Sequence, residues 1–186
     1  VVSKTVGNDL SRVTLFRALG ASPSSGAITI SISGSGNIYG AWQITEFANI
    51  ETTGTNGSGA IVQSASNSQL PPPNNTSLTV TLAAFGSTNN ATYGAFRTAG
   101  DGTAKITPGT GFTELGETSG ADTDLEAEWR NDNDTSVDAS WASTDSNARG
   151  VAVEIKNATQ GGGGGFTEWP LMRTTGGVSS FRGPTA

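Results

Sequence analysis

The chain of 186 residues contains no cysteine and no histidine. Without cysteine it has no disulfide scaffold, no thiol catalysis and no cysteine-ligated structural zinc. Without histidine it lacks the commonest general base at neutral pH and cannot hold a Ser-His-Asp triad. We therefore expect a protein that is not an enzyme and that uses no cofactor and no metal.

Charge is also scarce. Charged residues make up 14% of the chain and the net charge is −6, whereas average globular proteins carry roughly 25% charged residues. The few basic residues are scattered, although binding a phosphate backbone requires clustered Lys and Arg. No apolar run approaches the ~20 residues of a membrane span. We expect neither nucleic-acid binding nor membrane insertion.

The polarity of the chain comes from Ser, Thr, Asn and its 26 glycines. These residues suit turns and the solvent faces of strands, whereas exposed helix surfaces favour Ala, Glu, Lys and Gln. Such a composition is typical of secreted, fibrous or virion proteins. We expect an extracellular, all-β protein.

Apolar and polar residues alternate along at least eight short segments. In the clearest segment, 77–85, Leu78, Val80 and Leu82 alternate with Thr79 and Thr81. The other segments are 12–19, 27–33, 39–47, 91–99, 123–131, 136–144 and 149–157, and turn clusters such as "QLPPPNN" separate them. The spacing predicts an antiparallel, jelly-roll-like β-sandwich whose strands each have one solvated face. Two irregular stretches, 51–76 (with a short strand at 60–65) and 100–120, are expected to cap its ends.

Three motifs carry a resemblance to a known module. The succession of "TPGTGFTEL" (107–115), "LEAEWR" (125–130) and "GVAVEIK" (150–156) resembles a β-sandwich module of phage structural proteins and bacterial surface proteins. The resemblance covers roughly residues 1–157 and implies a fold, with no catalytic residues. Such modules have more strand before the position of Val1, so the resemblance also implies an open sheet edge here. Open edges recruit partners.

Two acidic patterns could carry chemistry. Glu126 and Glu128 share one face of a predicted strand, and a glycosidase needs two carboxylates about 5 to 10 Å apart. Almost any acidic strand meets that spacing, so we expect a solvated sheet face. In "NDNDTSVD", Asp132, Asp134 and Asp138 could ligate calcium. The segment lacks the glycine and terminal Glu of an EF-hand loop, and an ordinary hairpin turn is the favoured interpretation.

Aromatic residues could form a platform for a sugar. Trp42, Trp129, Trp141 and Tyr93 all lie in predicted strands. A sandwich of this size also needs large side chains in its core, since each Trp buries about 150 to 250 Å². We favour core positions, with Trp42 facing inward together with Ile44. Glycan binding remains open.

The C-terminal region changes character after residue 157. Residues 158–165 include five consecutive glycines, Gly161 to Gly165, and are expected to be a flexible linker after a sandwich domain of residues 1–157. The following arm, 166–186, has too many apolar groups for water and too few for a core. Its expected subunit-contact residues are Phe166, Trp169, Leu171, Met172, Val178 and Phe181. We expect docking on a neighbouring subunit slightly more than on the chain's own sandwich.

These observations favour a non-enzymatic structural subunit of an extracellular assembly. The resemblance points to a phage virion, as a capsid decoration, tail or fibre protein. The partners would be copies of the chain or other virion or surface subunits. The alternatives are a glycan-binding or adhesin module and a subunit of a bacterial or archaeal extracellular filament. A glycoside hydrolase would need a cleft with two carboxylates of different pKa.

Overall fold

A computed structural model describes residues 2–5, 12–19, 27, 29–30, 37–69, 75–99, 106–120, 123–142, 147–158 and 173–182. Within these ranges the chain forms strands and one short 3₁₀ turn. The elements are β1 (Val2–Thr5), β2 (Arg12–Leu15), β3 (Asn37–Glu46), η1 (Thr55–Ala60), β4 (Ile61–Ser68), β5 (Ser77–Thr81), β6 (Ala91–Thr98), β7 (Ile106–Pro108), β8 (Thr113–Gly120), β9 (Thr123–Arg130), β10 (Ser136–Trp141), β11 (Arg149–Ile155) and β12 (Arg173–Arg182). The described part contains no helix long and apolar enough to cross a membrane.

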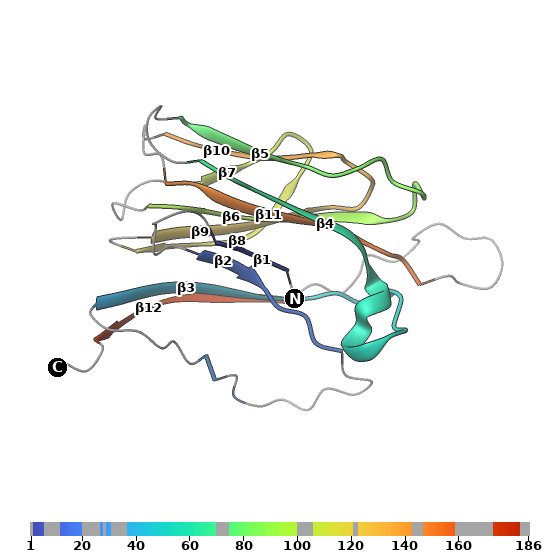
Figure 1. Cartoon of the computed structure of the whole chain (residues 1–186), viewed down its shortest axis with the longest axis horizontal. Coiled ribbons are helices and arrows are strands. Elements are labelled where there is room, and N and C mark those ends of the chain that lie inside the picture. The colour runs from blue at the N-terminus through green and yellow to red at the C-terminus, as the bar shows by residue number, and fades with distance from the viewer. Residues whose placement is uncertain are drawn as a thin grey trace.

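A central five-stranded sheet organises the fold, with the order β4-β11-β6-β9-β8. An outer three-stranded sheet, β5-β10-β7, covers one face (Figure 1). Two antiparallel pairs, β1-β2 and β3-β12, lie on the other side. The first pair packs against β4 and β11, and the second packs against β8 and β9. The predicted all-β, antiparallel β-sandwich is confirmed, with the central sheet covered on both faces.

The core consists of two apolar clusters, one on each face of the central sheet. Leu78, Val80, Phe96, Val137 and Trp141 belong to the cluster beneath the outer sheet. The second cluster contains residues of the opposite parity on the central strands, together with a residue of β2. Its members are Val13, Ala91, Tyr93, Ala95, Ala127, Trp129, Val151, Val153 and Ile155. Successive residues of β6, β9 and β11 therefore face opposite sides of the central sheet, and each side has its own buried interior.

The expectation of one solvated face for each strand is correct for the outer sheet and wrong for β6, β9 and β11, the three inner strands of the central sheet. On β5, the exposed residues Ser77, Thr79 and Thr81 alternate with buried Leu78 and Val80. On β11, by contrast, all seven residues are buried. The central strands are buried on both sides because a further layer covers each face, and periodicity within one strand cannot reveal the number of layers.

Several predicted boundaries need correction. Residues 106–108 and 113–120, expected to be irregular, form β7 and β8. Only positions 27, 29 and 30 of the predicted strand 27–33 are described, and they lie outside any strand. The strand predicted at 77–85 ends at Thr81, whereas the short strand predicted at 60–65 extends to Ser68 as β4. Charged and glycine-rich sequence in β8 hides its strand character.

Candidate functional site

The C-terminal arm contributes β12, which pairs with β3 along its whole length. Ten consecutive pairs run from Arg173 opposite Glu46 to Arg182 opposite Asn37. We call this two-stranded unit the ribbon. It is visible at the bottom of Figure 1, below the central sheet. In the described part of the chain, its strands pair only with each other.

Two of the six predicted contact residues lie in the ribbon. Val178 is opposite Ala41, and Phe181 is opposite Ile38. The other four, Phe166, Trp169, Leu171 and Met172, lie outside the described residues. Both paired strands, β3 and β12, belong to the same chain here. Docking of the arm on a neighbouring subunit therefore stays a prediction.

The acidic strand face is a second candidate, and the structure corrects our expectation of it. Glu126 and Glu128 of β9 are fully buried, each with 0% exposure, and point beneath the outer sheet. The face is not solvated because β7 and the following turn pack over β8 and β9. Each carboxylate is directly opposite another on β8, with Glu117 opposite Glu126 and Glu114 opposite Glu128.

These carboxylates accept hydrogen bonds from the edge of the outer sheet. The Ile106 amide donates to Glu117 Oε1 at 2.7 Å, and the Gly109 amide donates to Glu128 Oε2 at 2.8 Å. Pro108 lies between these two residues and has no amide hydrogen, so it needs no hydrogen-bond acceptor. Since unpaired buried amides are costly, the carboxylates serve a structural purpose. We call Glu117, Glu126 and Glu128 with this edge the acidic seam.

Glu126 is the exception within the acidic seam. Neither of its side-chain oxygens has a hydrogen-bond partner among the described residues. Burial, followed by the negative charges of Glu128, Glu114 and Glu117, raises the pKa of Glu126 to about 9. Burial also raises the pKa of Glu128 to about 8, although the bond from Gly109 acts in the opposite direction. Both side chains are therefore largely protonated at neutral pH.

The opposite side of the sandwich is closed by amide side chains. Gln63 of β4 donates from Nε2 to the Ala83 carbonyl at 3.0 Å and accepts from the Ala83 amide at 2.9 Å. Asn67 Nδ2 donates to the Thr79 carbonyl at 2.7 Å. These bonds attach β4 to the main chain of the β5 region. We call this arrangement the amide seam; nothing in the alternation of apolar and polar residues predicts it.

A buried carboxylate in the amide seam is fully satisfied, unlike Glu126. Glu154 of β11 accepts from Gln63 Nε2 at 2.6 Å and from Asn90 Nδ2 at 2.5 Å. It is 0% exposed, and both of its oxygens have donors. Of these two buried carboxylates, Glu126 is the one whose oxygens have no hydrogen-bond donor among the described residues.

The aspartates proposed as calcium ligands are arranged as a turn. Arg130 forms ion pairs with Asp132 and Asp134, the latter at 2.7 Å. Asp134 Oδ1 also accepts from the Ser136 amide at 2.9 Å, as in an Asx turn. Asp138 lies apart, next to Gly109. No group of three or more acidic residues in the described ranges is placed to hold a metal ion.

The aromatic residues do not form a sugar platform in the described part. Tyr93, Trp129 and Trp141 are buried, and the Trp141 indole donates to the Asn75 carbonyl at 3.0 Å. Trp42 is half-buried and belongs to neither core cluster, so the inward position predicted for it with Ile44 is wrong. On β3, the Thr45 hydroxyl lies near the Tyr93 phenol instead.

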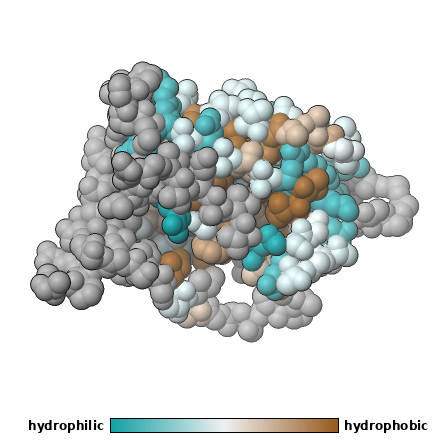
Figure 2. All heavy atoms as spheres, viewed as in Figure 1, coloured by the Kyte–Doolittle hydropathy of each residue, from teal (hydrophilic) through white to brown (hydrophobic). Residues whose placement is uncertain are grey.

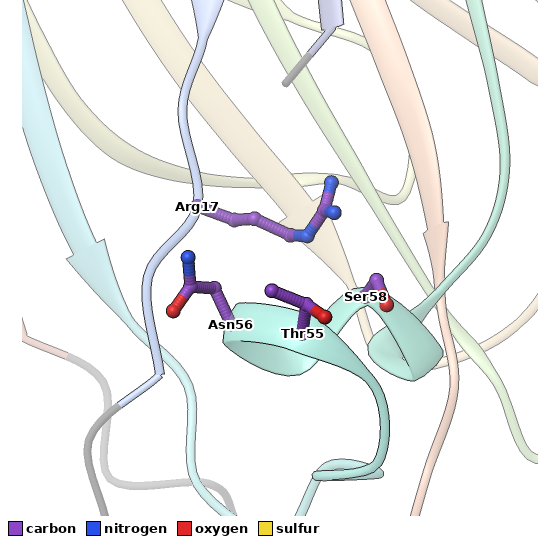
Figure 3. Close-up of a pocket in the computed structure, with 4 residues that line it drawn as sticks. All are labelled: Arg17, Thr55, Asn56 and Ser58. Carbon is purple, nitrogen blue, oxygen red and sulfur yellow. The ribbon is translucent and has the colours of Figure 1, made fainter.

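One small hollow lies beside η1. Arg17, Thr55, Asn56 and Ser58 line it, and its volume is about 210 Å³. Figure 3 shows the Arg17 side chain extending across the turn, and the four described lining residues include no aromatic side chain. Ligand pockets usually measure roughly 300 to 1,000 Å³, so we assign no ligand to it. The coloured surface in Figure 2 is mostly pale or teal, with small separate brown areas.

No family model matches the chain, and neither does any curated protein or any solved structure. The resemblance to modules of phage and bacterial surface proteins therefore stays a prediction.

Proposed function

We propose that the protein is a non-enzymatic structural subunit of an extracellular assembly. A phage virion is the setting we favour, with the chain as a capsid decoration, tail or fibre protein. Its copies associate through the C-terminal arm and through free strand edges. The sandwich serves as the rigid body that the arm connects.

The pairing of β12 with β3 is the observation that carries this proposal. A strand of ten residues pairs along its full length with a partner that precedes it by more than a hundred residues in the chain. Between β12 and the end of the sandwich lies a stretch that contains five consecutive glycines. A tethered strand that adds to an exposed strand is a recurrent mode of protein association.

The closed sides of the sandwich give further support. The amide seam and the acidic seam engage the outer sheet from both sides through side chains of β4, β8 and β9. Partner strands therefore have less access to the outer sheet than to the ribbon. In the described part of the chain, β8, β4, the two ribbon strands and the strands of the pair β1-β2 also retain an edge with no strand partner.

The alternatives have less support from the described residues. A glycoside hydrolase would need two carboxylates that a sugar can reach, but Glu126 and Glu128 are buried. A glycan-binding module would need exposed aromatics, and three of the four candidates are buried. A cell-surface filament would use the same arm contact, so it differs from a virion in setting and not in mechanism.

The test is the mass of the intact chain in solution, measured by light scattering over a concentration series, with electron microscopy of the same samples. We expect oligomers or filaments that increase with concentration. A chain carrying Gly177→Pro and Val178→Pro loses an amide directed at β3, because successive amides point to opposite strand edges. This variant should stay monomeric. Gly162→Pro with Gly163→Pro is the matched control and should still assemble. A monomeric intact chain at every concentration would contradict the proposal.

A further inference from the structure

We propose that the acceptor of the exchanged arm is β3 of a second copy of this chain. In the assembly, β12 of one copy pairs with Asn37–Glu46 of another, in the register that the structure shows within one chain. This inference rests on the proposed function and names its contact surface and its partner.

The ribbon is a self-contained pairing unit. Every strand pairing of β12 in the described residues is with β3, and β3 has no other strand partner there. An exchanged β12 would therefore keep all ten residue pairs when the acceptor belongs to a second copy. Exchange of an identical element between copies needs no new complementary surface, which makes it a low-cost route to association.

The two ribbon strands are anchored differently. β3 continues directly into Phe47 and Ile50, which pack against the second core cluster. The Phe47 ring meets the Tyr93 ring edge-on, with centroids 5.8 Å apart and planes at 87°. The Glu51 amide then donates to the Lys156 carbonyl at 3.0 Å. These contacts hold β3 on its own sandwich, so β3 is suited to be the acceptor.

β12 has no comparable main-chain anchor among the described residues, apart from its pairing with β3. The last described residue before it is Ala158, whose amide donates to the Asn49 carbonyl at 3.0 Å. Fourteen residues, 159–172, separate Ala158 from Arg173, and five of them are the consecutive glycines. β12 also packs against β8, but its main-chain pairing is to β3 alone. β12 is thus suited to be the donor.

The length of the intervening stretch decides when exchange occurs. Fourteen residues reach at most about 50 Å when extended, and about 20 Å as a glycine-rich coil. A tether of this kind holds its strand at an effective concentration in the millimolar range. In dilute protein, β12 should therefore pair with β3 of its own chain. Pairing with β3 of another copy competes once the local concentration of subunits is similar to this effective concentration. We infer an arm that exchanges as the assembly forms.

The absence of cysteine from the whole chain allows a disulfide test. One population carries Ala41→Cys and a second carries Val178→Cys, positions that are directly opposite in the ribbon. Opposite residues in antiparallel strands have Cβ atoms about 4.5 to 5.5 Å apart, close to disulfide geometry. The control replaces the second population with Thr174→Cys, four residues from Val178 along β12, or about 13 Å away.

The two populations are mixed under assembling conditions, oxidised and separated by mass. We expect disulfide-linked dimers containing one copy of each variant, at least ten times more abundant than in the control mixture. Gly40→Cys with Ser179→Cys repeats the test at the adjacent pair, since one of two adjacent pairs is always the closer, non-hydrogen-bonded type. This second pair decides the test if the first destabilises the chain.

Two results would overturn the inference, and they are distinguishable. If the chains assemble but neither mixture gives more cross-linked dimer than its control, assembly uses another contact and β3 is not the acceptor. If Ala41→Cys and Val178→Cys in one chain form only an intrachain disulfide, and no oligomers appear at any concentration, the proposed function fails as well.

Discussion

Glu126 of β9 lies directly opposite Glu117 of β8 inside the sandwich, and the two carboxyl groups have different partners. Glu117 accepts a hydrogen bond from the Ile106 amide, whereas neither oxygen of Glu126 has a donor among the described residues. Like charges directly opposite on adjacent strands are destabilising. Both groups can be accommodated in the folded protein because Glu126 keeps its proton.

Stability should therefore fall as pH rises. The pKa of Glu126 is about 9 in the folded protein, compared with 4.5 as its ordinary value. Between these values the folded state binds more protons than the unfolded state, so the free energy of unfolding decreases with pH. At about 1.4 kcal/mol per pKa unit, the loss is on the order of 6 kcal/mol. Thermal unfolding midpoints from pH 4 to pH 10 measure it, and a midpoint that rises over this range would refute the assignment.

Replacing Glu126 by glutamine should flatten this dependence. The amide has nearly the same shape and cannot ionise, so the variant should be more stable than the parent at pH 9 and similar to it at pH 5. Glu46→Gln makes the same chemical change at an exposed position on β3, and it should leave the pH dependence intact. Thermal unfolding at the two pH values compares all three proteins. Equal pH slopes for parent and Glu126→Gln would show that another group titrates.

Gly150 should not tolerate alanine. An added Cβ there would lie 2.7 Å from Phe96 Cε1 and 2.8 Å from Val80 Cγ2, at the centre of the core beneath the outer sheet. Overpacking of this kind costs about 1 to 3 kcal/mol, which denaturant unfolding can measure. Gly86→Ala is the matched control, since nothing lies within 4 Å of its added Cβ. Similar unfolding free energies for the two variants would contradict this packing.

The amide seam should contribute to stability through Gln63. Gln63→Leu keeps the volume but removes both bonds to Ala83 and one of the two donors to buried Glu154. An unsatisfied buried acceptor costs roughly 1 to 3 kcal/mol, and denaturant unfolding should show a loss of that size. The exposed neighbour Ser64→Ala is the control. If Gln63→Leu is as stable as this control, the seam is held by other contacts.

Much of the fold follows from local alternation. In β5, Leu78 and Val80 alternate with threonines, and the buried and exposed faces are as predicted, although the strand ends at Thr81 and not at residue 85. The positions of Trp129 and Trp141 in the core follow from the same pattern together with their size. These features depend on the two faces of one strand, which the sequence records directly.

The acidic seam could not be predicted from the sequence. Alternation places Glu126 and Glu128 on one face of β9, but it does not say whether that face meets solvent or a second sheet. The answer depends on β7, a strand of three residues with no periodicity to recognise. The ribbon was missed for a related reason, since Gly176 and Gly177 interrupt any apolar pattern in β12. Pairings between distant segments leave little local signal.

The most direct measurement is the solution mass of the intact chain beside that of a chain ending at Asn157, by light scattering under the same conditions. Circular dichroism establishes that the shorter chain is folded. At concentrations high enough for exchange between copies to compete with closure within one chain, the account predicts oligomers or filaments for the intact chain and a folded monomer for the shorter one. Equal masses for the two folded chains would contradict it, because the C-terminal arm would then have no part in assembly.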